Sequence, residues 1–440
     1  MTMRWRNSAG MRIAVMVLVS FVLILPTFMI QNLVREREMT RNSAVAEVSG
    51  KWGGGQAVAG PILTVPLKKQ IKDDKGKVTG TSMRYAHFLP DNLSVNGTIY
   101  PHVRHRGIYD MALYNSKLAF SGIFSQPDFD GLGIDGEEII WKDASLGIGI
   151  TDMKGIKETI AISWNDTSLT AGPGIESPDI LCSGVSTPIV LDKTARLYPF
   201  SFAMDLNGSQ ELKFLPLGRE TKIILSSTWS NPSFQGSFLP EKREVSNKGF
   251  TAEWQVLQLN RNFPQRWIGK QHDIYSSAFG VNLFMPVDQY QKTSRSLKYA
   301  LLFIGLTFTA YFIIELLNKR SMHPIHYMLV GLALVLFYSL LLSLSEHIGF
   351  NYSYLAASFC TIFMITAYTK SVLADKTIAA AVFVILSLLY GFLYVLLQIE
   401  DYALLLGSIG LFVILGLVMY LTRKIDWFSA MRSEEGILHE

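Results

Sequence analysis

The sequence is poor in the residues that build disulfide scaffolds and familiar active sites. It has only two cysteines in 440 residues, and they are not expected to pair, because Cys182 falls in a polar region and Cys360 in an apolar run. A hydrophobic core must therefore stabilise any domain outside the cytoplasm. Gly-x-Ser-x-Gly, His-Glu-x-x-His, Walker and Cys-x-x-Cys patterns are missing. These absences argue against the familiar enzyme classes and predict no catalytic residue, cofactor or metal.

The chain also has little excess of one sign of charge over the other. The net charge is only +4, and part of it comes from basic residues that flank apolar runs. A small excess of this kind gives no reason to expect nucleic acid as a partner.

Long apolar runs are present, and their placement is the most informative feature of the chain. A helix needs about 20 mostly apolar residues to cross the hydrocarbon core of a membrane. One such run lies near the N-terminus and five lie in the last third, with a long polar region between them. The six predicted spans are residues 11–31, 297–317, 327–345, 352–369, 378–397 and 402–421. The predicted fold is a six-helix membrane bundle with one large domain inserted after the first helix, and membrane lipid is an expected partner.

The distribution of lysine and arginine orients these spans. Basic residues precede the first run and follow the second, fourth and sixth, whereas the two opposite loops, SEHIGF and QIEDY, contain none. The residues that set this pattern are Arg4, Arg6, Arg12, Lys319, Arg320, Lys370, Lys376, Arg423 and Lys424. Two basic pairs on the other side, Arg35/Arg37 and Arg295/Lys298, flank a large translocated domain and are tolerated there. Both termini are therefore predicted to be cytoplasmic, with the large domain outside.

The first apolar run resembles either a signal peptide or an uncleaved anchor. Its apolar stretch is too long for a signal peptide, and no small-x-small cleavage site follows it. The next segment, QNLVREREMTRNSAVAEV, contains good helix formers and neither glycine nor proline. We expect an uncleaved anchor whose helix extends beyond the membrane.

The inserted domain has the pattern of antiparallel β structure. Segments such as ILTVPL, TIAISW, SFAMDL, TKIILSSTW and FTAEWQVLQL alternate apolar and polar residues and are rich in β-branched and aromatic side chains. The pairs Asn96-Gly97 and Asn207-Gly208 predict tight hairpin turns, because this dipeptide favours them.

Several features recur along the inserted domain at a similar offset and suggest a duplication. The two Asn-Gly pairs are followed by Phe-x-Gly-x-Phe motifs and then by Gly-x4-Trp motifs, in the same order. These later motifs are Phe120–Phe124 with Gly136 and Trp141, and Phe234–Phe238 with Gly249 and Trp254. Chance similarity between two β-rich halves is the alternative. The predicted division is residues 1–54 (cytoplasmic N-terminus, first span and helical extension), 55–184 (first β-sandwich-like module and a linker), 185–292 (second β-sandwich-like module) and 293–440 (five-helix bundle with a short cytoplasmic tail).

Two ligand motifs in one acidic loop are interpreted as turns. The string GLGIDG matches a dinucleotide fingerprint, but it lies between β strands and lacks a strand–helix context. The surrounding loop contains Asp128, Asp130 and Asp135, whereas Leu132 and Ile139 occupy positions where a calcium loop needs oxygen donors. An acidic turn is favoured over a cation site.

Two basic clusters are the candidate binding residues of the inserted domain. Arg104 and Arg106 lie in HVRHRG, and Arg261, Arg266 and Trp267 lie in NRNFPQRW. Such groups can hold phosphate or an anionic polymer through charge-assisted hydrogen bonds and stacking. The alternative is a solvated strand edge.

Ionisable residues near the spans gather at the ends of the helices. Glu315 and His323 lie near the inner end, close in sequence to His326, and Glu346 and His347 lie at the outer end. About 20 residues of helix, or about 30 Å, separate the two histidine groups, so they cannot share a metal or a proton. Interfacial or capping roles are favoured over a functional site or a transport gate.

The chain resembles the CreD family of bacterial inner-membrane proteins. The likeness covers nearly all of it and rests on long segments such as WGGGQAVAGPILTVP, LPDNLSVNGTIYPHVRHRGIYD, LPLGRETKIILSSTWSNPSFQGSFLP, RSLKYALLFIGLTFTAYFIIELL and HPIHYMLVGLALVLFYSLLLSLSEHIGFNYSYLAAS. The resemblance implies a Gram-negative inner-membrane protein associated with cell-envelope integrity, and it lends no catalytic residue. His326 stands where the family is expected to carry glutamine, which weakens a metal role for the histidine pair.

The sequence supports three hypotheses about function. In the first, the periplasmic β domain binds an envelope component, such as a protein or an anionic polymer, and the helices anchor it. In the second, the protein is a transporter or flippase-like protein for a lipid or envelope precursor. An enzyme with a site in the membrane is the third and least supported.

Overall fold

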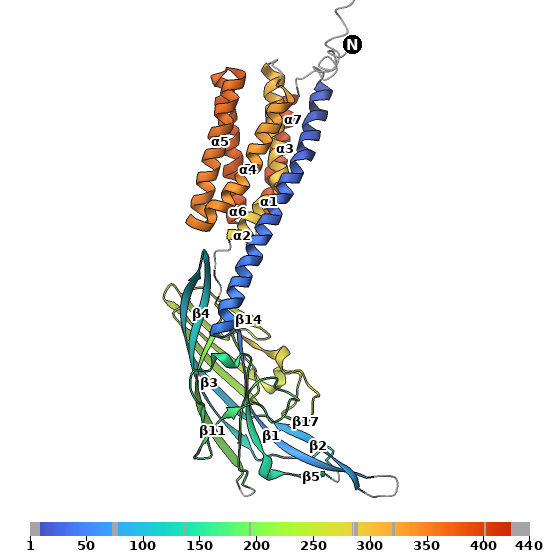
Figure 1. The fold of residues 1–440 in the computed structure, drawn as a ribbon, viewed down its shortest axis with the longest axis vertical. Helices are drawn as coiled ribbons and strands as arrows, with labels where there is room; N and C mark the ends of the chain where they lie inside the picture. Colours follow the sequence, from blue (N-terminus) through green and yellow to red (C-terminus); the bar gives the residue numbers. More distant parts are fainter. Residues whose placement is uncertain are drawn as a thin grey trace, which may run out of the picture. The chain divides into compact units, whose positions relative to one another are not determined.

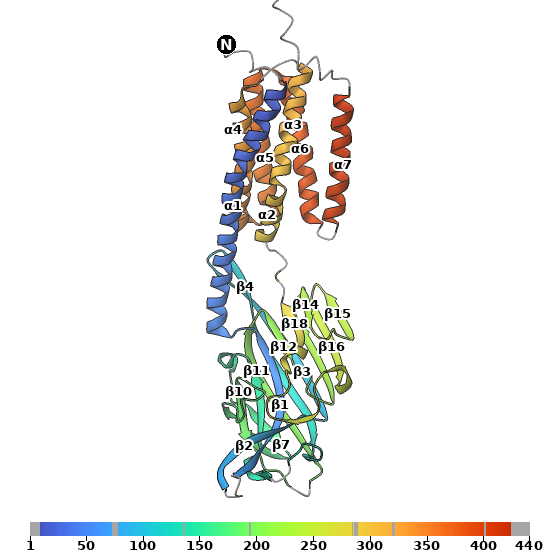
Figure 2. The same cartoon turned by 90° about the vertical axis from the view of Figure 1, so that its right-hand side faces the viewer.

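The chain folds into two compact units. The computed structural model describes residues 9–72, 78–134, 137–192, 195–283, 285, 289–318, 322–399 and 402–423. One unit, the helical unit, comprises Met1–Arg41 and Val287–Glu440, and the other, the β domain, comprises Asn42–Pro286 (Figures 1 and 2). Some residues used in the sequence analysis lie outside the described residues. These are Arg4, Arg6, Lys319, Arg320 and Lys424, used for topology, and Asp135 and Gly136.

Among the described residues, the helical unit contains the six predicted apolar helices, the first of which continues into the β domain, and one short polar helix, α2. They are α1 (Ala9–Trp52), α2 (Gln289–Lys298), α3 (Ala300–Asn318), α4 (Pro324–Ile348), α5 (Phe350–Leu373), α6 (Lys376–Gln398) and α7 (Ala403–Thr422). In the described part of the chain, α1, α4, α5, α6 and α7 are long and apolar enough to cross a membrane, and α2 with α3, bent by 46°, add a sixth if they form one span. A membrane helical part combined with a β-rich domain is therefore confirmed.

Local sequence explains where these helices begin and how they pack. The Asp375 side chain accepts hydrogen bonds from the first amides of α6, and Pro324 begins α4 after His323, whose ring accepts from Ile325 N. Gly331 lets α4 approach α1 closely, because a Cβ there would lie 2.2 Å from the Leu23 side chain.

The described residues of the β domain form a ten-stranded sheet A and an eight-stranded sheet B. Sheet A contains β1 (Gln56–Lys72), β2 (Val78–Phe88), β5 (Glu137–Ile139), β6 (Ser145–Ile150), β9 (Gly172–Pro173), β10 (Gly184–Pro188), β12 (Glu211–Phe214), β14 (Pro232–Gly236), β17 (Arg266–Ile268) and β18 (Phe279–Leu283). Sheet B contains β3 (Asn92–Arg106), β4 (Tyr109–Ser125), β7 (Ala161–Trp164), β8 (Thr167–Thr170), β11 (Leu197–Ser209), β13 (Glu220–Ser227), β15 (Lys242–Ser246) and β16 (Gly249–Leu257).

The two sheets share one hydrophobic core. Alternate residues of the strands point inward, and rings from the two sheets meet there, such as Trp254 of β16 with Phe279 of β18 at 5.8 Å and Phe120 of β4 with Phe214 of β12 at 6.4 Å. This single core replaces the disulfides that the domain lacks.

The segments predicted as two modules are interleaved within this sandwich. Both sheets take strands from both segments, and at the centre of each sheet a strand of one segment pairs in parallel with a strand of the other, β1 with β12 and β3 with β13. The chain from 55 to 286 therefore builds one sandwich around one core.

The landmarks used to predict a duplication lie in different kinds of element. Asn96-Gly97 and Asn207-Gly208 lie inside β3 and β11, so the predicted hairpin turns are wrong at both positions. Phe120–Phe124 lies in β4 of sheet B, whereas Phe234 lies in β14 of sheet A. Ladder pairing on both sides outweighs the turn preference of a single dipeptide. These landmarks give the predicted duplication no structural support.

The last turns of α1 belong to the β domain and pack against β4. Val45 lies in a small apolar cluster with Met111 and Leu113, and Trp52 Nε1 donates to Tyr114 O at 3.2 Å. The helix is unbroken from Ala9 to Trp52, as predicted for an extension beyond the apolar run.

The segment that follows α1 is fixed closely to the strands. The buried Gln56 side chain donates to the carbonyls of Asp152 and Asn207 at 3.0 Å each, and accepts from Asp152 N at 3.1 Å. Gly53 has φ +140°, and a Cβ there would lie 2.7 Å from Asn207 O. Glycine is required at this position because the backbone is unfavourable for other residues and the space is filled.

Candidate functional site

A groove of about 690 Å³, lined by both polar and apolar groups, lies on the face of sheet B that points away from the core. Its walls come from strands β3, β4, β7, β11 and β13 and from the turn after β7. The residues around it are Asn92, Leu93, Ser94, Ser121, Gly122, Ile123, Ser163, Asp166, Pro199, Phe200, Ser201, Glu220 and Lys222. The middle of this lining consists of serines and a glycine, and these small residues leave a depression in the outer face of sheet B.

A row of serines crosses the groove and continues one strand beyond it, to Ser168 of β8. The strand register places Ser94, Ser121, Ser201, Ser163 and Ser168 opposite one another on neighbouring strands β3, β4, β11, β7 and β8. Neighbouring strands lie about 4.8 Å apart, so the row is about 19 Å long. Each hydroxyl is a donor and an acceptor. Such a surface can form repeated hydrogen bonds to an extended polar ligand.

Charged side chains border this serine row. Lys222 of β13 lies opposite Ser94 and donates to Glu253 at 2.8 Å. This hydrogen bond lowers the pKa of Glu253 and raises that of Lys222. Glu220 accepts from Gln255 at 2.7 Å, and Asp166 is exposed in the turn between β7 and β8. The border therefore carries both signs of charge.

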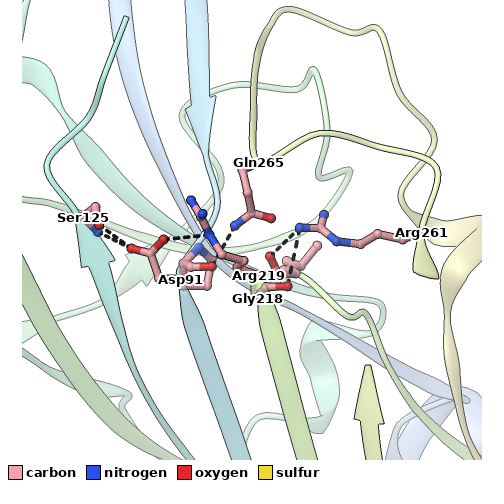
Figure 3. Close-up of polar contacts among 8 residues, drawn as sticks. Asp91, Ser125, Gly218, Arg219, Arg261 and Gln265 are labelled. Carbon is pink, nitrogen blue, oxygen red and sulfur yellow. Dashed lines mark hydrogen bonds and ion pairs between the residues drawn. The ribbon is translucent and has the colours of Figure 1, made fainter. Parts of the chain in front are cut away.

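A hydrogen-bonded network lies beside the groove, where β3 and β13 begin (Figure 3). The carboxylate of Asp91 accepts from Ser125 N at 2.9 Å and from Ser125 Oγ at 2.5 Å, and it contacts Arg219 Nε at 3.2 Å. Gln265 donates from Nε2 to Pro90 O at 2.9 Å. Sequence reasoning missed Asp91 and Arg219, although the same Phe-Leu-Pro precedes both strands, at residues 88–90 and 214–216.

Arg261 lies next to this network and is buried. Only 8% of it is exposed, and its Nη2 donates to the carbonyls of Leu217 and Gly218 at 3.4 and 3.5 Å (Figure 3). Its guanidinium stacks over Phe263 at 4.3 Å, while Nε and Nη1 have no partner in the described structure. Burial lowers the pKa of Arg261 to about 10.

The other two candidates of this segment have defined partners. Arg266 forms an ion pair with Asp128, and this hydrogen bond lowers the pKa of Asp128. Trp267 is buried, and its ring lies 5.9 Å from the ring of His87. Trp267 is therefore part of the core. No group of metal-ligating side chains is found among the described residues.

The second basic cluster lies elsewhere in the β domain. Arg104 and Arg106 lie at the end of the β3–β4 hairpin, and Arg106 forms an ion pair with Glu47 of α1 at 2.7 Å. Strand β3 has 15 residues, so about 45 Å separate this end from the end near Arg261. The structure therefore does not bring the two predicted clusters together.

A buried histidine that sequence reasoning missed lies between two polar side chains. His87 Nδ1 is 3.1 Å from Thr64 Oγ1, and Nε2 is 3.4 Å from Asp179 Oδ2. Burial lowers the pKa of His87 to about 4, against the opposing effect of Asp179. No sequence motif marks this pair, because 92 residues separate its members.

In the helical unit, one of the inner polar residues, Glu315, contacts a basic residue of α1. Glu315 is buried, accepts from Met322 N at 2.7 Å and lies 3.7 Å from Arg12 Nη1. His323 accepts from Ile325 N at the start of α4, and His326 Nδ1 lies 2.6 Å from the Tyr368 hydroxyl. The His323 contact is the helix-capping role considered for this cluster.

The outer polar residues form a second, separate cluster. Glu346 accepts from the Tyr290 hydroxyl at 3.0 Å and lies 3.9 Å from Arg37 Nε. His347 is exposed in the last turn of α4. Helix α4 has 25 residues, about 37 Å, so the inner and outer clusters share no contact.

Fold and site together define a multi-span membrane protein that carries a single β-sandwich domain between its first and its remaining apolar helices. Comparison with known proteins gives the family. Residues 8–428 match the family model described as Inner membrane protein CreD. The chain is 34% identical over 415 residues to Inner membrane protein CreD of Escherichia coli strain K12, which covers 93% of this chain and 91% of that protein. The chain belongs to the CreD family of inner-membrane proteins.

Proposed function

We propose that this protein supports the cell envelope from the inner membrane by binding an envelope polymer along the groove of sheet B. The observation that carries the proposal is the row of serine hydroxyls across that groove, bordered by Lys222 and Asp166. The β domain lies in the periplasm and both termini in the cytoplasm, because the basic residues collect in the loops on one side.

The groove favours an extended and hydroxyl-rich ligand. Apolar pockets bind ligands by excluding water, whereas this groove exposes hydroxyl, amide and charged side chains beside its apolar surface. An extended glycan presents donors and acceptors along its length, and a row of about 19 Å accommodates several sugar rings. The ligand class proposed is therefore a polar glycan polymer of the envelope.

The proposal is tested with a matched pair of substitutions on β11. Ser201→Leu places a bulky apolar side chain in the groove, whereas Ala203→Leu places it two residues along the same strand and outer face, outside the groove. We expect Ser201→Leu to weaken retention of the purified full-length protein on isolated cell-wall sacculi about tenfold, the equivalent of about 1.4 kcal/mol.

The control variant Ala203→Leu should bind as the unmodified protein does. Equal retention of both variants, or no retention of the unmodified protein, would show that the groove does not bind a wall glycan. Thermal unfolding of each variant separates lost binding from lost folding.

The transporter or flippase hypothesis has less support. Glu315 and Glu346, the carboxylates that it needs, each lie near an arginine of α1, as expected for residues that hold helices together. The proposal also assigns no enzymatic activity.

A further inference from the structure

Arg261 is a buried cation whose hydrogen-bonding capacity is mostly unused. Only its Nη2 has acceptors, and those contacts of 3.4 and 3.5 Å are long. Nε and Nη1 have no partner in the described structure and are shielded from water. Stacking on Phe263 offsets part of the cost of burying the charge. Buried charges in proteins are normally paired with an opposite charge.

The nearby acidic side chains have other partners. Asp91 contacts Arg219 and Ser125, and Glu220 contacts Gln255. Within the described residues, no ion pair joins Arg261 to a carboxylate. The surroundings of Arg261 therefore contain the donors of an anion site without an acidic side chain to fill it.

We propose that Arg261 receives an oxyanion, a carboxylate or a phosphate, from a ligand of the β domain. The guanidinium matches the geometry of either group, because it donates in a plane. Entry requires the turn between Gln258 and Gln265 to open, and the two residues flanking Arg261 within that turn, Asn260 and Asn262, are exposed.

The position of Arg261 relates this site to the groove. Its acceptor Gly218 directly precedes Arg219 and Glu220, which belong to the Asp91 network and the groove border. The oxyanion could come from a free ion or from an acidic group on the glycan polymer proposed above. Binding of an acidic group on the polymer rests on the proposed function, whereas binding of a free ion does not.

The test uses the full-length protein in detergent and measures its thermal unfolding by tryptophan fluorescence, since six of the eight tryptophans lie in Asn42–Pro286. Inorganic phosphate or acetate is titrated against sodium chloride at equal ionic strength. We expect a saturating ion to raise the unfolding temperature by about 2–4 °C. Arg261→Met should abolish this shift and Arg261→Lys should retain part of it.

Lys270→Met is the matched control, because it removes one exposed cation close to Arg261 in the sequence and should keep the thermal shift.

A second experiment measures retention of the same variants on sacculi. Loss of retention in Arg261→Met without any phosphate or acetate shift in the unmodified protein assigns the oxyanion to the polymer. An unchanged shift and unchanged retention in Arg261→Met would overturn the site. If Ser201→Leu loses retention on sacculi while Arg261→Met keeps both its retention and its thermal shift, the groove proposal stands and the Arg261 site is overturned.

Discussion

Individual buried polar residues in the β domain differ in how well they are satisfied. The Gln56 side chain, which follows the end of α1, makes three hydrogen bonds to backbone atoms of Asp152 and Asn207, and these replace the hydrogen bonds to water that it loses on burial. Arg261 is buried to a similar degree but lacks partners for two nitrogens. A satisfied group of the first kind contributes to stability, whereas the unsatisfied nitrogens of Arg261 are the basis of the oxyanion site proposed above.

His87 should make the β domain sensitive to acid. Burial holds the His87 ring neutral in the folded state, with a pKa of about 4, whereas the unfolded pKa is near 6.5. Between these values the unfolded chain binds a proton that the folded chain refuses. The free energy of unfolding therefore falls as the pH drops from about 6.5 to about 4, by about 3 kcal/mol for this residue.

His87→Gln should remove this part of the acid sensitivity. The measurement is urea unfolding of the full-length protein at neutral pH and near pH 4, followed by tryptophan fluorescence. His105→Gln is the control, because His105 is exposed and contacts Asp110. The same acid loss in His87→Gln and in the unmodified protein would contradict the prediction.

At the scale of the secondary-structure elements, the connection between α1 and β1 depends on a short glycine-rich segment. Gly53 adopts φ +140° against Asn207 O, whereas Gly50, one turn earlier within α1, has open space where a Cβ would lie, with no atom within 4 Å. Identical substitutions at these two glycines should therefore have opposite effects.

Gly53→Ala should destabilise the β domain by about 2 kcal/mol or more, because alanine suffers both backbone strain and a steric clash there. Gly50→Ala should be neutral or stabilising by up to about 1 kcal/mol, since alanine favours the helix. Urea unfolding of both variants measures the difference. Equal stabilities would show that the segment tolerates a side chain and does not fix α1 to the strands.

At the scale of the whole molecule, the charge pattern predicts that the β domain lies outside the cytoplasm. Cys182 is exposed in that domain, and Cys360 lies within the apolar helix α5. In spheroplasts, a membrane-impermeant maleimide should label Cys182 without lysis, and Cys182→Ser should abolish the labelling. Cys360→Ser should leave it unchanged. Labelling only after lysis would reverse the proposed orientation.

Sequence patterns predicted whether a segment is helix or strand better than they predicted which segments pack or pair with it. The apolar runs coincide with α1 and α3–α7, because hydrophobicity over a membrane length is a property of consecutive residues. The hairpin turns at Asn96 and Asn207 were wrong, since strand pairing comes from residues far away in the chain. The predicted binding residues followed local composition, which did not distinguish the buried Trp267 from the exposed Arg104.

The sequence by itself determined that this protein has membrane helices, a β-rich inserted domain and CreD-family membership, because each of these rests on hydropathy, alternation or identity along the chain. Only the tertiary structure decided that both β segments share one sandwich, that serines from four strands align across a groove, and that Arg261 is buried without a counter-charge. These features depend on register and burial, which arise from contacts between residues distant in the sequence.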